Sequence, residues 1–290
     1  MSKLNGRTVE HYRTPEITEE QRRLIDHPNS IFTLNENGRL EWVGEKEDVQ
    51  IFQQLIQILS ATRQLSDELF IEQVLPNLEE ILAKSELFTK LNSKAIRVTT
   101  GHSGQTPYEH TIKVLRELKT DGIEAELRFF LRLTAIYHDT GKAISGGMTQ
   151  KEINQLIPPE EKHSHPSHAE LGAMIFRQLI DQVENRGKIA DESFWEAMEL
   201  VILYHHFFQD FKEQVQTEEQ FLAFIRAVRF ELIAKIFLLC RADMFGGVNY
   251  AEYWQENVSV YQELLGKNFS AELTPEEKAQ LFFYLSLATV

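Results

Sequence analysis

The sequence predicts an all-α protein, and three observations support that fold class. From residue 47 onward, apolar residues recur at helical spacing in nearly every segment of the chain. Capping-box patterns, glycines and prolines divide this periodicity into lengths that suit single helices. Only residues 31–43 show the short apolar runs and the glycine-containing turn of a β-hairpin. We therefore expect a helical bundle that carries one small hairpin.

Residues 1–95 are predicted to form an N-terminal helical extension that carries this hairpin. The pattern Thr18-Glu-Glu-Gln21 is a capping box and predicts a short helix before the hairpin. After the hairpin, residues 51–59 and 69–82 each present the apolar face of a helix. Pro76 interrupts the second face and is expected to kink or restart its helix.

Residues 96–290 are predicted to form the main helical domain together with its C-terminal helices. The expected helices span residues 108–119, 124–138, 149–157, 167–183, 192–208, 217–242, 250–265 and 274–287. Gly141 is expected to stop the second of them. No linker is long enough to force two independent domains, so the extension should pack on the bundle.

Composition and charge exclude several classes of partner. The net charge of −14 argues against an extended nucleic-acid surface or an anionic-membrane surface, because both need basic patches. No apolar run approaches the roughly 20 residues that span a bilayer, and the N-terminus lacks the apolar core of a signal peptide. The lone Cys240 has no partner for an internal disulfide. We expect a cytoplasmic protein, and a homodimer is possible.

His138 and Asp139 are adjacent at the end of a predicted buried helix, and a metal ion is the usual reason for such a pair. Neighbouring residues diverge by about 100° within a helix, whereas a fraying helix end lets both side chains turn toward one point. Further candidate ligands also lie at predicted helix ends, where a bundle would bring them together; these are His110, His168, His205 and Asp243.

These ligand types predict one or two divalent metal ions. Histidine and carboxylate ligands without thiolate favour Mn, Fe, Co, Ni or Zn, with Mg also considered. One ion would be held by His110, His138, Asp139 and Asp243. His168 and His205 would complete a second site, with Asp139 bridging the two ions. His206 competes with His205 for this role, and His163 and His165 compete with His168.

Five segments, taken in order, resemble the HD-domain superfamily of metal-dependent phosphohydrolases. They are Tyr108–Leu115, Ala135–Lys142, His168–Ala173, Leu203–His206 and Cys240–Asp243. The resemblance covers about residues 97–249 and implies an HD-domain helical bundle. It also implies hydrolysis of a small phosphomonoester or phosphodiester, with a nucleotide as the favoured substrate, by a metal-activated water. The Gly-Tyr-Pro signature of the cyclic-di-GMP phosphodiesterase branch is missing.

In this hypothesis Asp139 and Lys142 are the catalytic residues. Lys142 would steady a phosphate oxygen, although a lysine beyond a helix C-terminus also complements the helix dipole. His206, His102 and Arg97 are further candidates for substrate binding. Two alternatives remain open: a di-iron oxygenase with the same ligands, and a nucleotide- or metal-sensing module without turnover.

Overall fold

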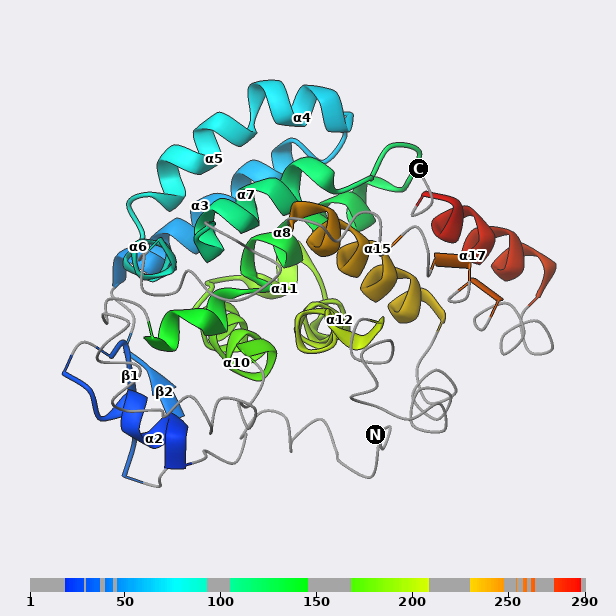
Figure 1. The fold of residues 1–290 in the computed structure, drawn as a ribbon. Helices are drawn as coiled ribbons and strands as arrows, with labels where there is room; N and C mark the ends of the chain where they lie inside the picture. Colours follow the sequence, from blue (N-terminus) through cyan, green and yellow to red (C-terminus); the bar gives the residue numbers. More distant parts are fainter. Residues whose placement is uncertain are drawn as a thin grey trace.

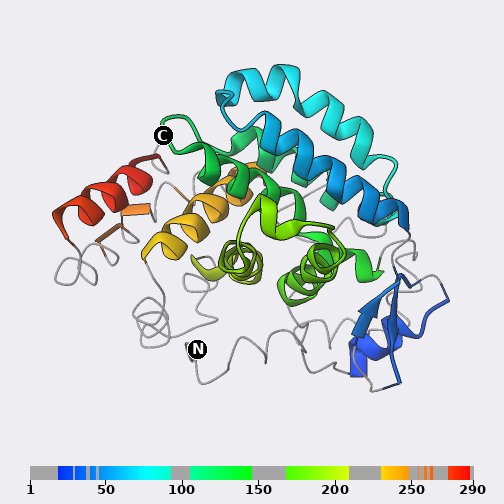
Figure 2. The ribbon, with the colours of Figure 1, turned by 180° about the vertical axis from the view of Figure 1, so that it is seen from behind.

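The prediction of an all-α fold is confirmed by the computed structural model of the chain (Figures 1 and 2). The structure describes residues 19–28, 30–36, 40–43, 46–92, 105–145, 168–208, 230–247, 254, 258–259, 262–263 and 274–287. Within these ranges the only strands are β1 (Phe32–Leu34) and β2 (Leu40–Trp42), and the other regular elements are helices.

The N-terminal elements begin with α2 (Glu19–Ile25) and the predicted hairpin. Strands β1 and β2 pair antiparallel, with Phe32 opposite Trp42. The backbone N–H of Trp42 donates to Oε1 of Gln178, 3.0 Å away on a helix of the main bundle. The hairpin is therefore attached to the bundle at one edge (Figure 1).

Four further helices of the extension lie over the bundle: α3 (Lys46–Ala61), α4 (Asp67–Gln73), α5 (Leu75–Leu82) and α6 (Glu86–Leu91). The break predicted near Pro76 is found at Val74, between α4 and α5. Pro76 is the second residue of α5, where the backbone N–H has no partner within the helix. It therefore restarts the helix, which was one of its two expected effects.

The main bundle is built around α8 (Ala125–Tyr137), which packs against α3 of the extension and against other helices of the bundle. Every residue of α8 from Leu127 to Tyr137 is buried. The surrounding elements are α7 (Pro107–Glu117), the 3₁₀ helix η2 (Thr140–Ser145), α10 (His168–Asp181), α11 (Arg186–Ile189), α12 (Glu192–Leu203), α15 (Phe230–Gly246) and α17 (Pro275–Leu287). One hydrophobic core runs through the extension and the bundle.

Three predicted boundaries near the candidate ligands differ from the structure. Gly141 does not stop a helix in the left-handed conformation; α8 ends at Tyr137 and Gly141 lies within η2. The helix expected over 192–208 ends at Leu203. The helix expected to end at 242 continues to Gly246, so Asp243 lies inside its last turns. The helices expected over 149–157 and 250–265 fall wholly or mostly outside the described residues.

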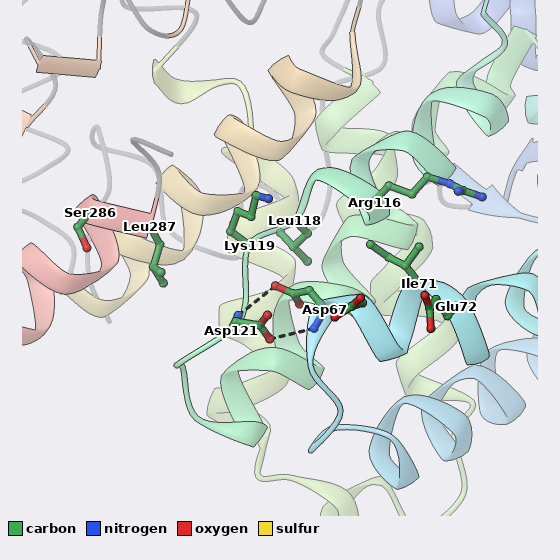
Figure 3. Close-up of a pocket in the computed structure, with 10 residues that line it drawn as sticks. Asp67, Ile71, Glu72, Arg116, Leu118, Lys119, Asp121, Ser286 and Leu287 are labelled. Carbon is green, nitrogen blue, oxygen red and sulfur yellow. Dashed lines mark hydrogen bonds between the residues drawn. The ribbon is translucent and has the colours of Figure 1, made fainter.

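Reciprocal hydrogen bonds fasten α4 to the loop between α7 and α8 (Figure 3). The carboxylate of Asp67 accepts from the backbone N–H groups of Thr120, at 2.6 Å, and Asp121, at 3.0 Å. Oδ1 of Asp121 accepts from the backbone N–H of Asp67 at 2.9 Å. The buried Arg132 of α8 also donates to Asp67, at 3.1 Å. The extension is thus fixed to the helices that carry the candidate ligands.

Within the described ranges, none of the helices combines the length and the apolar character that crossing a bilayer requires.

Candidate metal centre

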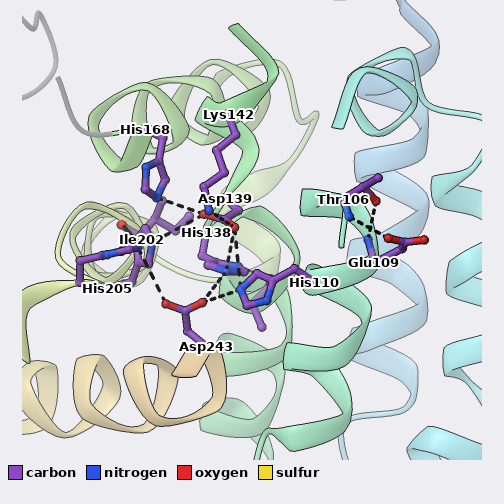
Figure 4. A network of polar contacts seen from close by, with 12 residues as sticks. Thr106, Glu109, His110, His138, Asp139, Lys142, His168, Ile202, His205 and Asp243 are labelled. Atoms are coloured by element: carbon purple, nitrogen blue, oxygen red, sulfur yellow. Dashed lines mark hydrogen bonds and ion pairs between the residues drawn. The ribbon is translucent and has the colours of Figure 1, made fainter. Parts of the chain in front are cut away.

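His110 lies in the first turn of α7 because of the way this helix begins. Thr106 is the N-cap, and its Oγ1 accepts from the N–H of Glu109 at 3.2 Å. Oε2 of Glu109 accepts in turn from the N–H of Thr106 at 2.7 Å, which completes a capping box (Figure 4). Pro107 occupies the first turn, where its fixed φ suits a helix. This start directs the buried His110 toward α15.

His138 and Asp139 follow the last residue of α8, and both side chains are fully buried. Nδ1–H of His138 donates to the carbonyl oxygen of Ala135 at 2.8 Å. This bond fixes the ring and leaves the lone pair on Nε2, which faces Asp139 and Asp243. The ring is therefore already oriented as a metal ligand.

His168 is the first residue of α10, while His205 and His206 lie in the turn that follows α12. Because α12 ends at Leu203, the two adjacent histidines are not held about 100° apart by a helix. Nδ1–H of His205 donates to the carbonyl oxygen of Ile202 at 2.6 Å, so its Nε2 also keeps the lone pair. Both histidines face Asp139 and His168. The sequence had left open which of the two would be the metal ligand.

The potential ligand atoms form two groups, each with members within 4.8 Å of one another. We call His110, His138 and Asp243 the buried group; Nε2 of His110 lies 2.6 Å from Oδ1 of Asp243, and Nε2 of His138 lies 3.5 Å from the same oxygen. Asp139 turns its Oδ2 toward this group, 3.6 Å from Nε2 of His138 and 3.9 Å from Nε2 of His110 (Figure 4).

The other carboxylate oxygen of Asp139 faces the second set of ligands. We call Asp139, His168, His205 and His206 the open group. Oδ1 of Asp139 lies 3.1 Å from Nε2 of His168 and 3.9 Å from Nε2 of His205. The side chains of His168 and His206 are 26% and 27% exposed, whereas those of the buried group do not exceed 8%. Asp139 thus turns one carboxylate oxygen toward each of the two ligand sets.

The electrostatics of the site favour deprotonated carboxylates. Burial would raise the pKa of Asp139, but the charge of Lys142 and the neighbouring histidines hold it well below its ordinary value. Burial likewise opposes the ionised form of Asp243, but its bond to His110 and its contact with His138 outweigh that effect and lower its pKa well below the usual range. Both carboxylates are therefore ionised at neutral pH.

The histidines of the two groups differ in their proton affinity. Burial and nearby positive charge lower the pKa of His168 and, far more, of His205, and burial together with His168 lowers that of His206 to about 3. These rings are neutral at pH 7, as metal ligands must be. Burial also opposes protonation of His138, but Asp139 and Asp243 outweigh it and raise its pKa. A cation bound beside those carboxylates would neutralise the charge that causes this rise.

The residues present fit a divalent metal. No described residue hydrogen-bonds to Nε2 of His138 or to Nε2 of His205, although both atoms are buried and aimed at carboxylates. Leaving a buried polar atom without a partner is unfavourable, and a metal ion held by its group would satisfy each nitrogen. Imidazole and carboxylate donors without thiolate suit Mn, Fe, Co, Ni or Zn.

The structure brings together the predicted ligands, which are His110, His138, Asp139, His168, His205 and Asp243. It also brings in His206, which the sequence offered both as a competitor of His205 for the ligand role and as a substrate contact. Lys142 reaches the site and pairs with Asp139. Arg97 and His102 lie outside the described residues. The competing His163 and His165 also lie outside them.

The site thus belongs to the class of histidine–aspartate centres carried by a helical bundle. Residues 108–225 match the family described as HD domain. This segment is therefore similar to an HD domain, in agreement with the resemblance of the sequence motifs to the HD-domain superfamily. Asp243 lies beyond the matched segment, yet α15 places it against His110. Comparisons with curated proteins and with solved structures gave no match.

Proposed function

We propose that the protein is a phosphohydrolase that acts on a small phosphomonoester or phosphodiester, with nucleotides as the first class to test. The observation that carries this proposal is the position of Asp139, which lies between two sets of histidine ligands and contacts a lysine. A divalent ion held there supplies a water of lowered pKa and positive charge for a phosphoryl oxygen. The match of residues 108–225 to the HD domain supports the same reaction class.

The residues of the chain would divide the work by position. The carbonyl oxygens of Ala135 and Ile202 hold His138 and His205 in the tautomer that offers Nε2 to a metal. Asp139 provides one oxygen to each ligand set. A small anion would enter from the side of the partly exposed His168, His206 and Lys142.

Lys142 provides the positive charge that a phosphate ester needs on this side. Its side chain is 21% exposed, so the ammonium group can reach solvent from a backbone that is anchored in η2. We therefore assign it to binding a non-bridging phosphate oxygen. The acidic chain offers no general attraction for phosphates, so a local cation and the metal must supply it.

The test is product release from a panel of phosphomonoesters, phosphodiesters and nucleoside triphosphates. It should be run with Mn²⁺ and with Fe²⁺ under anaerobic conditions, on the wild type and on Asp139→Ala. Asp26→Ala removes an equal charge from an exposed position outside the site and serves as the matched control. We expect turnover in the wild type and in the control, and its loss in Asp139→Ala. Bound metal without any product, or oxygen consumption by the iron-loaded protein, would contradict the proposal.

A further inference from the structure

Lys142 forms an ion pair with Asp139, one of the two carboxylates of the centre. Nζ of Lys142 lies 2.6 Å from Oδ2 of Asp139. Among the described residues, no other lysine or arginine lies within ion-pair distance of Asp139 or Asp243. The remaining partners of these two carboxylates are histidines.

The ammonium group sits on the oxygen that faces the buried group. Oδ2 is the oxygen of Asp139 that lies nearest to Nε2 of His138 and of His110. A divalent ion coordinated by Oδ2 and these two nitrogens would therefore share that oxygen with the ammonium group. Two cations this close repel each other strongly in a site that is almost free of solvent. The ammonium group and the metal are consequently competitors for the charge of Asp139.

The side chain of Lys142 can leave Asp139 without a movement of the backbone. The N–H of Lys142 donates to the carbonyl oxygen of Asp139 at 3.0 Å, which closes the first turn of η2. The next two residues, Ala143 and Ile144, are buried and hold this turn in the core. The flexible stem of Lys142 is partly exposed and can rotate without moving the turn.

We propose that Lys142 is a positioning residue that replaces the metal in the metal-free protein. Its ammonium group pairs with the buried carboxylate of Asp139 and orients it, and it leaves this carboxylate when a divalent ion binds. The displaced amine is then available for an anionic oxygen of the substrate. This inference rests on the proposed metal centre, and it adds that metal binding is what releases the lysine.

Metal affinity gives the first test, because it does not depend on turnover. We would titrate Mn²⁺ into metal-free wild type, Lys142→Met and Lys113→Met by isothermal calorimetry. Lys113 is an exposed residue of α7, so its substitution removes the same charge at a distance from Asp139. We expect Lys142→Met to bind its first Mn²⁺ about tenfold more tightly than the wild type. Lys113→Met should stay within about twofold, since an exposed charge is screened.

The outcomes separate the two proposals. A wild type that binds no Mn²⁺ would contradict the metal centre itself. A wild type that binds Mn²⁺ while Lys142→Met binds it equally or more weakly would overturn only the role of Lys142. In that case the lysine would be an aid to metal binding and not a competitor.

A second measurement needs no substitution and guards against a variant that fails to fold. The rate at which an acylating reagent modifies Lys142 can be followed by mass spectrometry of peptides, with Lys113 as the internal reference. Release from Asp139 should raise the rate at Lys142 several-fold when Mn²⁺ is added, with no change at Lys113. An unchanged or lower rate at Lys142 in protein that has bound Mn²⁺ would overturn the inference.

Discussion

The buried group and the open group are built from the same residue types, but they differ in how the fold surrounds them. His110 and Asp243 lie on α7 and α15, and His138 directly follows the last residue of α8; these three helices pack on one another. His205 and His206 lie in a turn, and His168 is the first residue of its helix. Side chains in the first set are almost completely buried, whereas His168 and His206 reach solvent.

Because of this difference, we expect the buried group and the open group to differ in metal affinity. Buried ligands fixed by packed helices lose little freedom when they bind an ion, whereas the partly exposed His168 and His206 lose more. We therefore expect the buried group to bind its ion tightly and the open group to exchange its ion with solvent. The exchangeable side is also where a substrate would replace water.

The largest expected effect comes from removing one ligand of each group. Asp243→Ala takes away the carboxylate that contacts both His110 and His138. We expect a loss of metal affinity and turnover greater than about 100-fold, because changing even the outer partners of metal ligands costs 10–100-fold. His206→Ala should abolish only the weaker binding event and leave one tightly bound ion. Elemental analysis after dialysis, together with calorimetric titration, measures both effects.

The matched control for these variants is His27→Ala, which removes a histidine from the N-terminal extension. It should bind metal as the wild type does. If His206→Ala lost both ions, or Asp243→Ala kept a tightly bound one, the division into a tight and an exchangeable half would be wrong.

A smaller effect is expected from the glycine that brings η2 against α10. A Cβ at Gly141 would lie 1.8 Å from the backbone oxygen of His168, so the two segments would have to separate. Gly141→Ala should lower the free energy of unfolding by about 1–3 kcal/mol, as overpacking does. It should also lower the metal affinity of the open group without changing that of the buried group. Gly187→Ala is the control, because its Cβ would meet nothing within 4 Å. Chemical denaturation of the metal-free proteins measures the difference, and equal stabilities would contradict it.

Much of the fold could be predicted from the sequence because its signals are local. The hairpin, the restart near Pro76 and the start of α17 at Pro275 follow from turn and capping patterns within a few residues. The expected effect of Gly141 was wrong, since its small size serves a contact with α10 that is distant in sequence. Local patterns carry no information about such a contact.

The candidate ligands were predictable because they recur in a fixed order along the chain. What the sequence could not decide was the orientation of adjacent histidines. A continuous helix over 192–208 would have turned His205 and His206 apart, but the turn after Leu203 directs both into the open group. No glycine or proline follows Leu203 to mark the end of α12 in the sequence.

The smallest expected effect is on the pH dependence of stability in the metal-free protein, where His206 of the open group and His138 of the buried group contribute with opposite signs. The pKa of His206 is lowered to about 3 by burial and by His168, so below pH 6.5 the unfolded chain binds a proton that the folded protein does not. Stability due to this group therefore falls as the pH falls from 6.5 toward 3. His138 has the opposite sign, because its pKa is raised: its contribution is complete below pH 6.5 and is lost as the pH rises through the folded value.

His206→Ala should consequently lose less stability than the wild type between pH 7 and pH 5. The side chain is 27% exposed, and solvent screening reduces the expected difference to about 1 kcal/mol. Urea denaturation at both pH values, with a chelator present, measures it. If the wild type and His206→Ala lost equal stability on acidification, His206 would be solvated in the folded protein, and the open group would be more open than its ring contacts with His168 and His205 indicate.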